Sequence, residues 1–233
     1  MIEQCLAEAM PGLTQEQTAR FVRYYELLVE WNARVNLTAI TDAHDVAQKH
    51  FADSVLPLLP LCAGLLPPHA RCVDVGTGAG FPGVPLMIMR PDLNMTLLDS
   101  LNKRLVFLDT LLKELGMSAE LVHARAEDAG RDPLRRERYD IALARAVAGT
   151  AALAEWTLPL LKVRGKALLY KGPKAEEELS SAAGALRLLH GEGRVIRCDA
   201  PWGERHITVL TKTAPTPKAY PRKAGTAVKN PLP

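Results

Sequence analysis

The chain has 233 residues, of which 48% are hydrophobic and 24% charged, and its net charge is +3. These values are ordinary for a globular protein, and the charge is too small to prove a polyanionic partner. The four cysteines are scattered without a Cys-x-x-Cys pair or zinc-type histidine spacing, so no metal is expected. Neither a secretion leader nor a membrane-length apolar run is visible, so we expect a cytoplasmic protein without membrane contact.

Residues 1–66 are predicted to form an N-terminal helical extension. A capping box at Thr14–Gln17 precedes an apolar stripe at helical spacing, which is typical of a packing surface. A second helical stretch is expected over residues 42–59. On it, His50 would share a face with Asp53 or Ser54, either above a ligand pocket or as ordinary caps.

Residues 67–213 alternate strand-like and helix-like segments, which favours an α/β core with a parallel-rich sheet covered on both faces. The last two expected strands have no helix between them, which predicts an antiparallel strand pair at the end of the core. The expected strands are 71–75, 95–99, 119–123, 139–145, 166–170, 194–198 and 206–212, and the expected helices are 84–90, 103–115, 149–161 and 175–190.

Residues 71–83 read as a buried strand, a glycine-rich turn and the start of a helix. A dinucleotide fingerprint has the spacing Gly-x-Gly-x-x-Gly, whereas here the third glycine comes one residue early and Phe81 takes the fingerprint position. Asp74 would repel a pyrophosphate but suits a cationic ligand such as S-adenosylmethionine. The pattern Asp-x-Gly-x-Gly-x-Gly resembles the first motif of S-adenosylmethionine-dependent methyltransferases, and predicts cofactor contacts from Asp74, Gly76, Gly78 and Gly80.

The next predicted strand ends in an acid, Asp99, where a nucleotide-binding α/β fold holds a ribose. Asp99 would accept hydrogen bonds from both ribose hydroxyls. The alternative is a helix cap, shared with Ser100 or Asn102. NAD would satisfy Asp99 equally well, so only the turn spacing and Asp74 separate the two cofactors.

Three further strand ends lie on the expected ligand side. After the third strand, Ala126 and Glu127 would offer a backbone amide and a carboxylate to an adenine edge, or form a solvated acidic loop. Arg145 ends an apolar strand, where it needs a polar ligand or an acid such as Asp140 or Asp53. Lys171 and Lys174 place two cations at the same rim.

Residues 214–233 form a basic C-terminal tail without an acidic residue. Its cations are interspersed with prolines and Tyr220, a composition that fits a phosphate backbone but also a solubilising disordered end. Together with the lysine rim after the fifth strand, it favours a nucleic-acid face. The cations are Lys218, Arg222, Lys223 and Lys229.

With these motifs, the chain from about Phe21 to Leu232 resembles the RsmG (GidB) family, bacterial methyltransferases that make 7-methylguanosine in 16S ribosomal RNA. The resemblance implies a Rossmann-like class I S-adenosylmethionine-dependent methyltransferase with a seven-stranded, mostly parallel sheet. It implies cofactor contacts from Gly76, Phe81, Ala126, Glu127 and Arg145. We expect RNA contacts, to 16S rRNA or the small ribosomal subunit, from His50, Lys171, Arg222, Lys223 and Lys229, and a monomer is favoured.

The implied chemistry is direct in-line displacement, because guanine N7 has a free lone pair at neutral pH. The chain lacks the Asn-Pro-Pro-Tyr type motif of exocyclic-amine methyltransferases after the fourth strand and a cysteine nucleophile at a ligand-side strand end. Arg145 and Lys171 are the predicted catalytic residues, positioning guanine O6 or a phosphate. The remaining hypotheses are a methyltransferase with another RNA, a protein or a small molecule as substrate, an NAD-dependent oxidoreductase, and a non-enzymatic RNA-binding protein.

Overall fold

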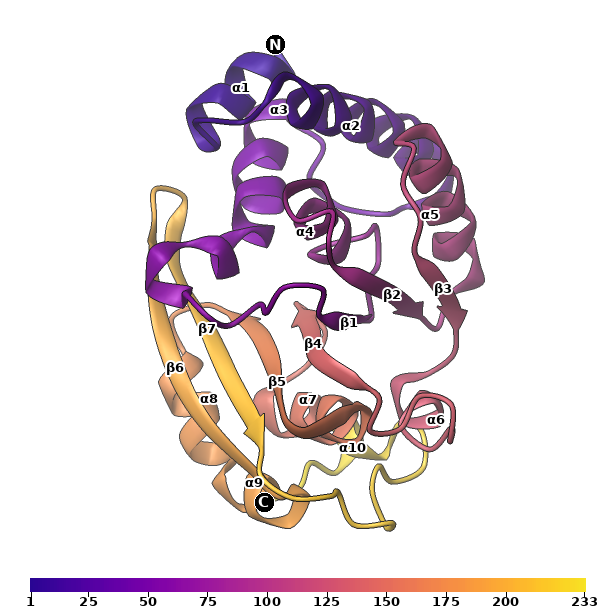
Figure 1. Cartoon of the computed structure of the whole chain (residues 1–233), viewed down its shortest axis with the longest axis vertical. Helices are drawn as coiled ribbons and strands as arrows, with labels where there is room; N and C mark the ends of the chain where they lie inside the picture. The colour runs from indigo at the N-terminus through magenta and orange to yellow at the C-terminus, as the bar shows by residue number, and fades with distance from the viewer.

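A computed structural model describes residues 1–233, except for the side chain of Asp199. Its centre is a seven-stranded sheet with the order β3-β2-β1-β4-β5-β7-β6 (Figure 1). β7 runs antiparallel to both of its neighbours, β5 and β6, and the other pairs are parallel, so the predicted antiparallel end of the sheet is confirmed. The strands are β1 (Arg71–Val75), β2 (Asn94–Asp99), β3 (Glu120–His123), β4 (Tyr139–Arg145), β5 (Leu161–Lys171), β6 (Gly191–Ala200) and β7 (Gly203–Lys212).

Helices cover both faces of the sheet. Alternate side chains of a strand point to opposite faces, so each strand contributes residues to both covers. On β4, Ile141 and Leu143 belong to one hydrophobic cluster with the N-terminal helices, whereas Ala142 and Ala144 belong to a second cluster with α7 (Thr150–Thr157) and α9 (Ala183–Leu189). This double cover explains why the strands read as continuous apolar runs.

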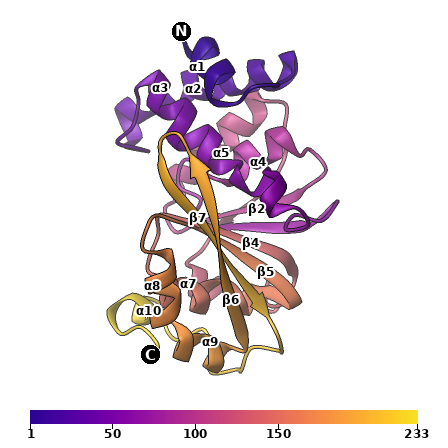
Figure 2. The same cartoon turned by 90° about the vertical axis from the view of Figure 1, so that its left-hand side faces the viewer.

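Helices α1 (Ile2–Ala9) and α2 (Gln15–Val35) lie at one end of the molecule (Figure 2). The predicted capping box of α2 is present. The stretch over residues 42–59 is helical for most of its length, as predicted, but it is not one continuous α-helix. It consists of α3 (Ala43–Asp45), the π-helix η1 (Val46–Ala52) and the 3₁₀ turn η2 (Leu56–Leu58), and a second 3₁₀ turn, η3 (Pro60–Cys62), follows.

The helices between the strands are close to those predicted, with three differences, one of which is the short helix α6 that was not predicted. The long helix expected over residues 149–161 ends as α7 at Thr157, and the 3₁₀ turn η4 (Leu158–Leu160) follows, because Pro159 cannot donate to the helix ladder. The helix expected over residues 175–190 is broken at Ala182 into α8 (Ala175–Ser181) and α9. The others are α4 (Gly83–Met89), α5 (Asn102–Glu114) and α6 (Ala126–Ala129).

The C-terminal tail packs on the core at the end opposite the N-terminal helices (Figure 2). It carries one short helix, α10 (Thr226–Lys229), and buries Ala227 and Leu232. Leu232 joins the hydrophobic cluster around α7. Among the described residues, no helix is both long and apolar enough to cross a membrane.

Candidate cofactor and substrate site

Four of the predicted site residues lie at the C-terminal ends of parallel strands. Asp74 is near the end of β1, Asp99 ends β2, Arg145 ends β4 and Lys171 ends β5. The strand order reverses between β1 and β4, and open α/β sheets bind their ligands at this switch point. The fold therefore collects these side chains at one edge of the sheet.

The glycine turn that follows β1 requires its glycines. Gly76 has φ +72° and Gly80 has φ +100°, a backbone region that other residues rarely adopt. A Cβ at Gly80 would lie 2.7 Å from the hydroxyl oxygen of Tyr24, which itself donates to the carbonyl of Ala79. The turn is thus pressed against α2 on one side, while Gly76 lines a cavity on the other.

Asp74 is fully buried beneath this turn. Its Oδ2 accepts hydrogen bonds from the hydroxyl of Thr77 at 2.7 Å and from the backbone N–H of Gly83 at 2.9 Å. Its Oδ1 is buried without a hydrogen-bond partner among the described residues. Burial raises the pKa of Asp74 to about 6, partly offset by those two hydrogen bonds. The site therefore holds an unsatisfied acceptor that favours a cationic or hydrogen-bonding ligand.

Asp99 links the end of β2 to the glycine turn. Its Oδ2 accepts from the N–H of Gly78 at 2.9 Å, and its Oδ1 accepts from the N–H of Leu101 at 2.8 Å, just before α5 begins. Arg104 approaches Oδ2 at 3.3 Å. Asp99 thus joins the glycine turn to the residue before α5, but it is not the cap that the alternative predicted, because the N-cap of α5 is Leu101 and receives no side-chain hydrogen bond.

A cavity of about 310 Å³ opens beside the turn, and we call it the nucleoside cavity. It brings together three of the predicted cofactor residues, Gly76, Ala126 and Glu127, with the strand ends of β1 and β2. Its other walls come from the loop after β3, from α7 and from the tail. Its lining is Val75, Gly76, Leu98, Ser100, Ala124, Arg125, Ala126, Glu127, Trp156, Gly225, Val228 and Lys229.

Phe81 lies behind the turn, in an aromatic stack. Its ring is stacked on His50 at 4.5 Å and on Tyr24 at 5.2 Å between centroids, and the Arg145 guanidinium lies 5.0 Å from its centroid. The ring is only 7% exposed. This environment assigns the Phe81 side chain to packing and to the support of Arg145.

Arg145 is held by the N-terminal helical segment. Its Nη1 donates to the carbonyls of Lys49 and His50 and to Asp53 Oδ2 at 3.2 Å. Of the two acids considered as partners of Arg145, the structure therefore shows Asp53. Asp140 instead accepts hydrogen bonds from the N–H of Arg71 and from Lys162. Asp53 also accepts from Arg205 Nε at 2.7 Å.

A second cavity of about 330 Å³ lies between η1 and the ends of β4 and β5, and we call it the cationic cavity. Its polar lining includes Lys49, His50, Arg145, Lys171 and Arg205. Burial and the Arg145 charge lower the pKa of His50 to about 4, so its ring is neutral near pH 7. The cavity also contains the Asp53 carboxylate, which pairs with Arg145 and Arg205, but cations outnumber it, so the lining suits an electron-rich or anionic ligand.

Lys171 has internal partners. Its Nζ donates to the carbonyl of Ala148 at 2.9 Å and to Glu178 Oε2 at 2.7 Å. Burial acts to raise the pKa of Glu178, but hydrogen bonds from Lys171 and Thr150 outweigh it and bring the pKa below its ordinary value. Lys171 thus fixes the loop after β4 to α8 while it lines the cationic cavity.

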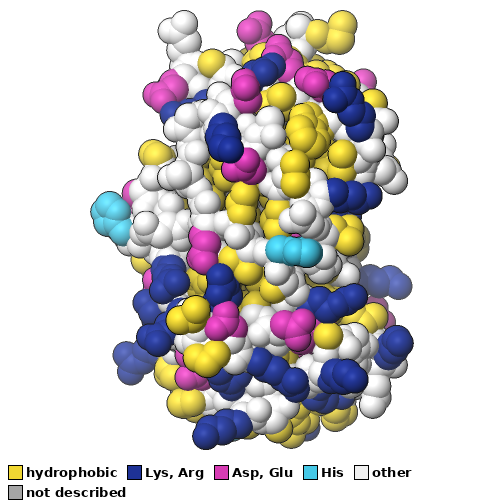
Figure 3. All heavy atoms as spheres, turned by 90° about the vertical axis from the view of Figure 1, so that its right-hand side faces the viewer, with side chains coloured by type: hydrophobic (Ala, Val, Ile, Leu, Met, Phe, Trp, Pro, Cys, Tyr) yellow, Lys and Arg dark blue, Asp and Glu magenta, His cyan; other side chains and the backbone are white. Residues whose placement is uncertain are grey.

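The tail cations differ in their surroundings. The Arg222 guanidinium pairs with the buried carboxylate of Glu155 at 2.7 Å, so it anchors the tail to α7. Lys223 and Lys229 are exposed, and Lys229 lines the nucleoside cavity beside Arg125. Figure 3 shows Lys and Arg side chains gathered over the lower half of the face that carries β3 and α6.

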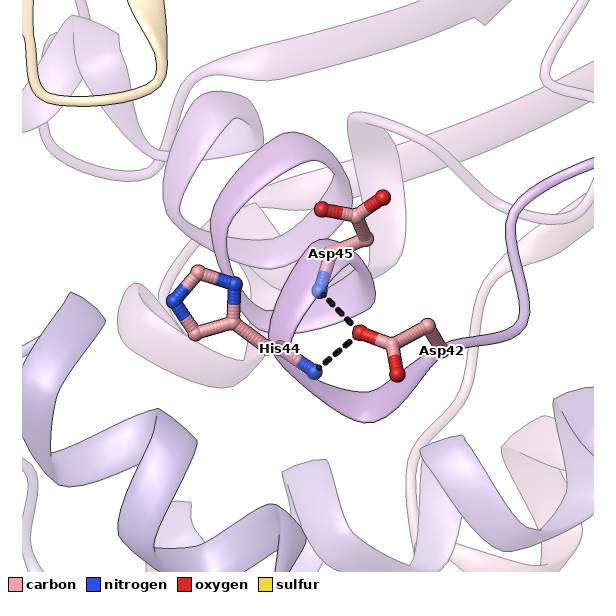
Figure 4. Close-up of side chains that lie close together, drawn as sticks. All are labelled: Asp42, His44 and Asp45. Atoms are coloured by element: carbon pink, nitrogen blue, oxygen red, sulfur yellow. Dashed lines mark hydrogen bonds between the residues drawn. The ribbon is translucent and has the colours of Figure 1, made fainter.

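One group of potential metal ligands lines neither cavity. Oxygen or nitrogen atoms of Asp42, His44 and Asp45 come within 4.8 Å of one another. Figure 4 shows that Asp42 accepts hydrogen bonds from the backbone N–H groups of His44 and Asp45, at 3.0 and 3.1 Å. This is the cap of α3, and the three side chains are largely solvated.

Sequence reasoning missed two parts of the site. Arg205, on β7, lines the cationic cavity, but nothing in its sequence surroundings distinguishes it from an ordinary strand arginine. Trp156 and the tail residues Gly225 and Val228 complete the nucleoside cavity. The absence of acids in the tail indicated its charge, whereas its apolar Ala227 and Leu232, both buried in the structure, were the signal that the tail packs on the core.

Comparisons with known proteins agree with this geometry. The profile of the family described as rRNA small subunit methyltransferase G matches residues 17–208. The chain is 47% identical over 224 residues to the ribosomal RNA small subunit methyltransferase G of Lactococcus lactis subsp. cremoris, with 94% of this chain and 93% of that protein covered. The protein of the same name from Streptococcus agalactiae is 46% identical over 232 residues, with 98% and 97% covered.

The fold is also similar to that of a methyltransferase from Pyrococcus furiosus, with a TM-score of 0.53 and 14% identity, over 84% of this chain and 100% of that one. At this identity the likeness shows the fold alone. The family match spans most of the chain, and the relatives align over nearly their whole length. The chain therefore belongs to the rRNA small subunit methyltransferase G family.

Proposed function

We propose that this protein transfers a methyl group from S-adenosylmethionine to N7 of a guanine in 16S ribosomal RNA. The observation that carries the proposal is the pair of cavities at the ends of β1 and β4, one beside the glycine turn and one lined by Arg145. Val147, two residues after Arg145, packs over Gly76. A Cβ added at Gly76 would lie 3.2 Å from the methyl groups of Val147. The two cavities therefore lie at the same switch point of the sheet, between β1 and β4.

The nucleoside cavity, together with the glycine turn and the buried acids Asp74 and Asp99 beside it, fits S-adenosylmethionine. The unpartnered Oδ1 of Asp74 is an acceptor for an ammonium group, and Asp99 lies where it can accept from a ribose. Gly76 and Gly78 keep the turn free of side chains, and Glu127 lies in the cavity wall. When bound, the cofactor supplies an electrophilic methyl group on sulfur.

The cationic cavity is the proposed guanine site. Arg145 is fixed by Asp53 and by backbone carbonyls of η1, and Lys171 is fixed by Glu178, so both can orient O6 or a phosphate without reorganisation. Guanine N7 carries a lone pair, so no side chain has to remove a proton before transfer. Both ring nitrogens of the neutral His50 have partners, Thr38 Oγ1 at 2.8 Å and Arg145 Nη2 at 3.5 Å, so His50 supports Arg145.

No cysteine is placed for covalent catalysis. Cys62, Cys72 and Cys198 are buried, and none of them lines either cavity. Burial raises the pKa of the Cys72 thiol to about 12, which keeps it protonated. These positions support direct transfer between the two ligands.

The test is transfer of labelled methyl from S-adenosylmethionine to small ribosomal subunits, naked 16S rRNA, free nucleosides and protein extract. The expected result is label in the ribosomal RNA only, recovered as 7-methylguanosine after digestion, with a large loss of turnover in Arg145→Ala. Label in another nucleoside or in protein would contradict the proposal. Full turnover of Arg145→Ala with unchanged affinity for both substrates would remove Arg145 from the site.

We also propose that the enzyme acts as a monomer in the cytoplasm, where ribosomal subunits are assembled. Light scattering after size exclusion tests the first part, and a dimer at working concentration would overturn it. Fractionation of cells that express the tagged protein tests the second part.

A further inference from the structure

The C-terminal tail covers one side of the nucleoside cavity. Gly225, Val228 and Lys229 form a wall opposite the strand ends of β1 and β2. These residues are about 150 positions beyond the glycine turn in sequence, so the fold and not local sequence brings them there. Val228 is 55% exposed, which leaves part of its side chain at the cavity mouth.

Two tethers hold this wall in place. The first is the ion pair between Arg222 and Glu155, in which Nε and Nη2 of the arginine both donate to the carboxylate, and the N–H of Arg222 adds a bond at 2.7 Å. The second is the N–H of Gly225, which donates to Glu127 Oε1 at 2.8 Å. Glu127 therefore contacts the tail and the cavity at once.

Helix α7 joins the tether to the cavity. Glu155 holds Arg222, and the next residue, Trp156, lines the nucleoside cavity. The indole Nε1 of Trp156 is buried without an acceptor among the described residues. Trp156 therefore brings a buried, unsatisfied donor to the side of the cavity that the tail also lines.

We propose that the segment from Tyr220 to Leu232 is a positioning wall for the adenosyl part of the cofactor, with Val228 as its contact residue and Glu127 as its link to the site. The inference rests on the proposed function, because it takes the occupant of the cavity to be an adenosyl nucleoside. The tail then has a role in cofactor binding that does not require RNA.

The test uses calorimetric binding of S-adenosylhomocysteine to the full chain, without RNA. Val228→Ala shortens the wall at a half-exposed position and should weaken binding roughly three- to ten-fold, with little change in melting temperature. The matched control is Val106→Ala on α5, which is also exposed, at 49%, and lines neither cavity. It should bind like the wild type.

Hydrogen exchange gives a second measurement that needs no variant. The ligand should slow amide exchange in residues 224–229 and leave exchange in the β6–β7 hairpin tip unchanged. If Val228→Ala binds like the wild type, or if the ligand leaves the tail amides unaffected, the wall proposal is wrong while the proposed function stands. If the wild-type protein does not bind S-adenosylhomocysteine at all, the proposed function itself is wrong.

Discussion

Arg222 and Glu155, 67 residues apart in sequence, form the ion pair that fixes the tail to α7. The carboxylate is fully buried and the arginine side chain is 23% exposed. Arg222→Ala would leave Glu155 buried without its cation, so we expect a loss of roughly 3 kcal/mol in the free energy of unfolding. Urea denaturation measures this change.

Lys223 supplies the control for that experiment, because it is adjacent and exposed. Lys223→Ala should change the free energy of unfolding by less than about 0.5 kcal/mol. Equal stability of Arg222→Ala and Lys223→Ala would show that the ion pair does not hold the tail.

Asp53 is the acid on which three donors converge. Its Oδ1 accepts from Trp202 Nε1 at 3.1 Å and from Arg205 Nε at 2.7 Å, and its Oδ2 accepts from Arg145. Asp53→Asn removes the charge between two guanidinium groups, and should cost roughly 3 kcal/mol of stability and most of the methyl transfer. Asp45→Asn, which breaks only the exposed pair with Lys49, should cost less than about 1 kcal/mol. A stable and fully active Asp53→Asn variant would contradict this role.

The sequence predicted the fold closely because strand burial and glycine spacing are local signals. Arg71–Val75 was expected with its exact bounds, and the acids Asp74 and Asp99 follow from their places at strand ends. The partners of Arg145 and Arg222 are separated from them by 92 and 67 positions, and no local pattern chooses among the many acids available. Tertiary packing alone makes that choice.

Long-range packing also explains why the predicted helical stretch over residues 42–59 is not a regular α-helix. Helical periodicity over residues 42–59 is real, but the segment must turn to bring His50 and Asp53 to Arg145, and it does so with a π-helical stretch. Such a widened turn is frequent at functional sites and has no clear sequence signature.

The Asp74 carboxyl, whose pKa burial raises to about 6, should make cofactor binding depend on pH. A cationic ligand binds the ionised carboxylate, so the affinity for S-adenosylmethionine should fall about tenfold per pH unit below that pKa and level off above it. Calorimetry between pH 4.5 and 8 measures the profile. Asp74→Asn should bind more weakly with a flat profile, and Asp109→Asn, on the surface of α5, should follow the wild type. A flat wild-type profile would exclude Asp74 as the partner of the cation.

His50 provides a stability prediction with a defined sign. Burial and the Arg145 charge lower its pKa from 6.5 to about 4. Between these values the unfolded chain binds a proton that the folded chain does not, so this group lowers the free energy of unfolding as the pH falls, by about 3 kcal/mol in total.

His50→Gln removes that titration, so its stability should decline less than that of the wild type between pH 6.5 and 4, as measured by urea denaturation at several pH values. The exposed His44 offers the control, and His44→Gln should parallel the wild type. An NMR titration of the ring provides an independent reading, with a midpoint near pH 4. A midpoint near 6.5, with parallel stability curves for His50→Gln and the wild type, would show that the ring is solvated and that the packing between Phe81 and Arg145 is looser than the structure describes.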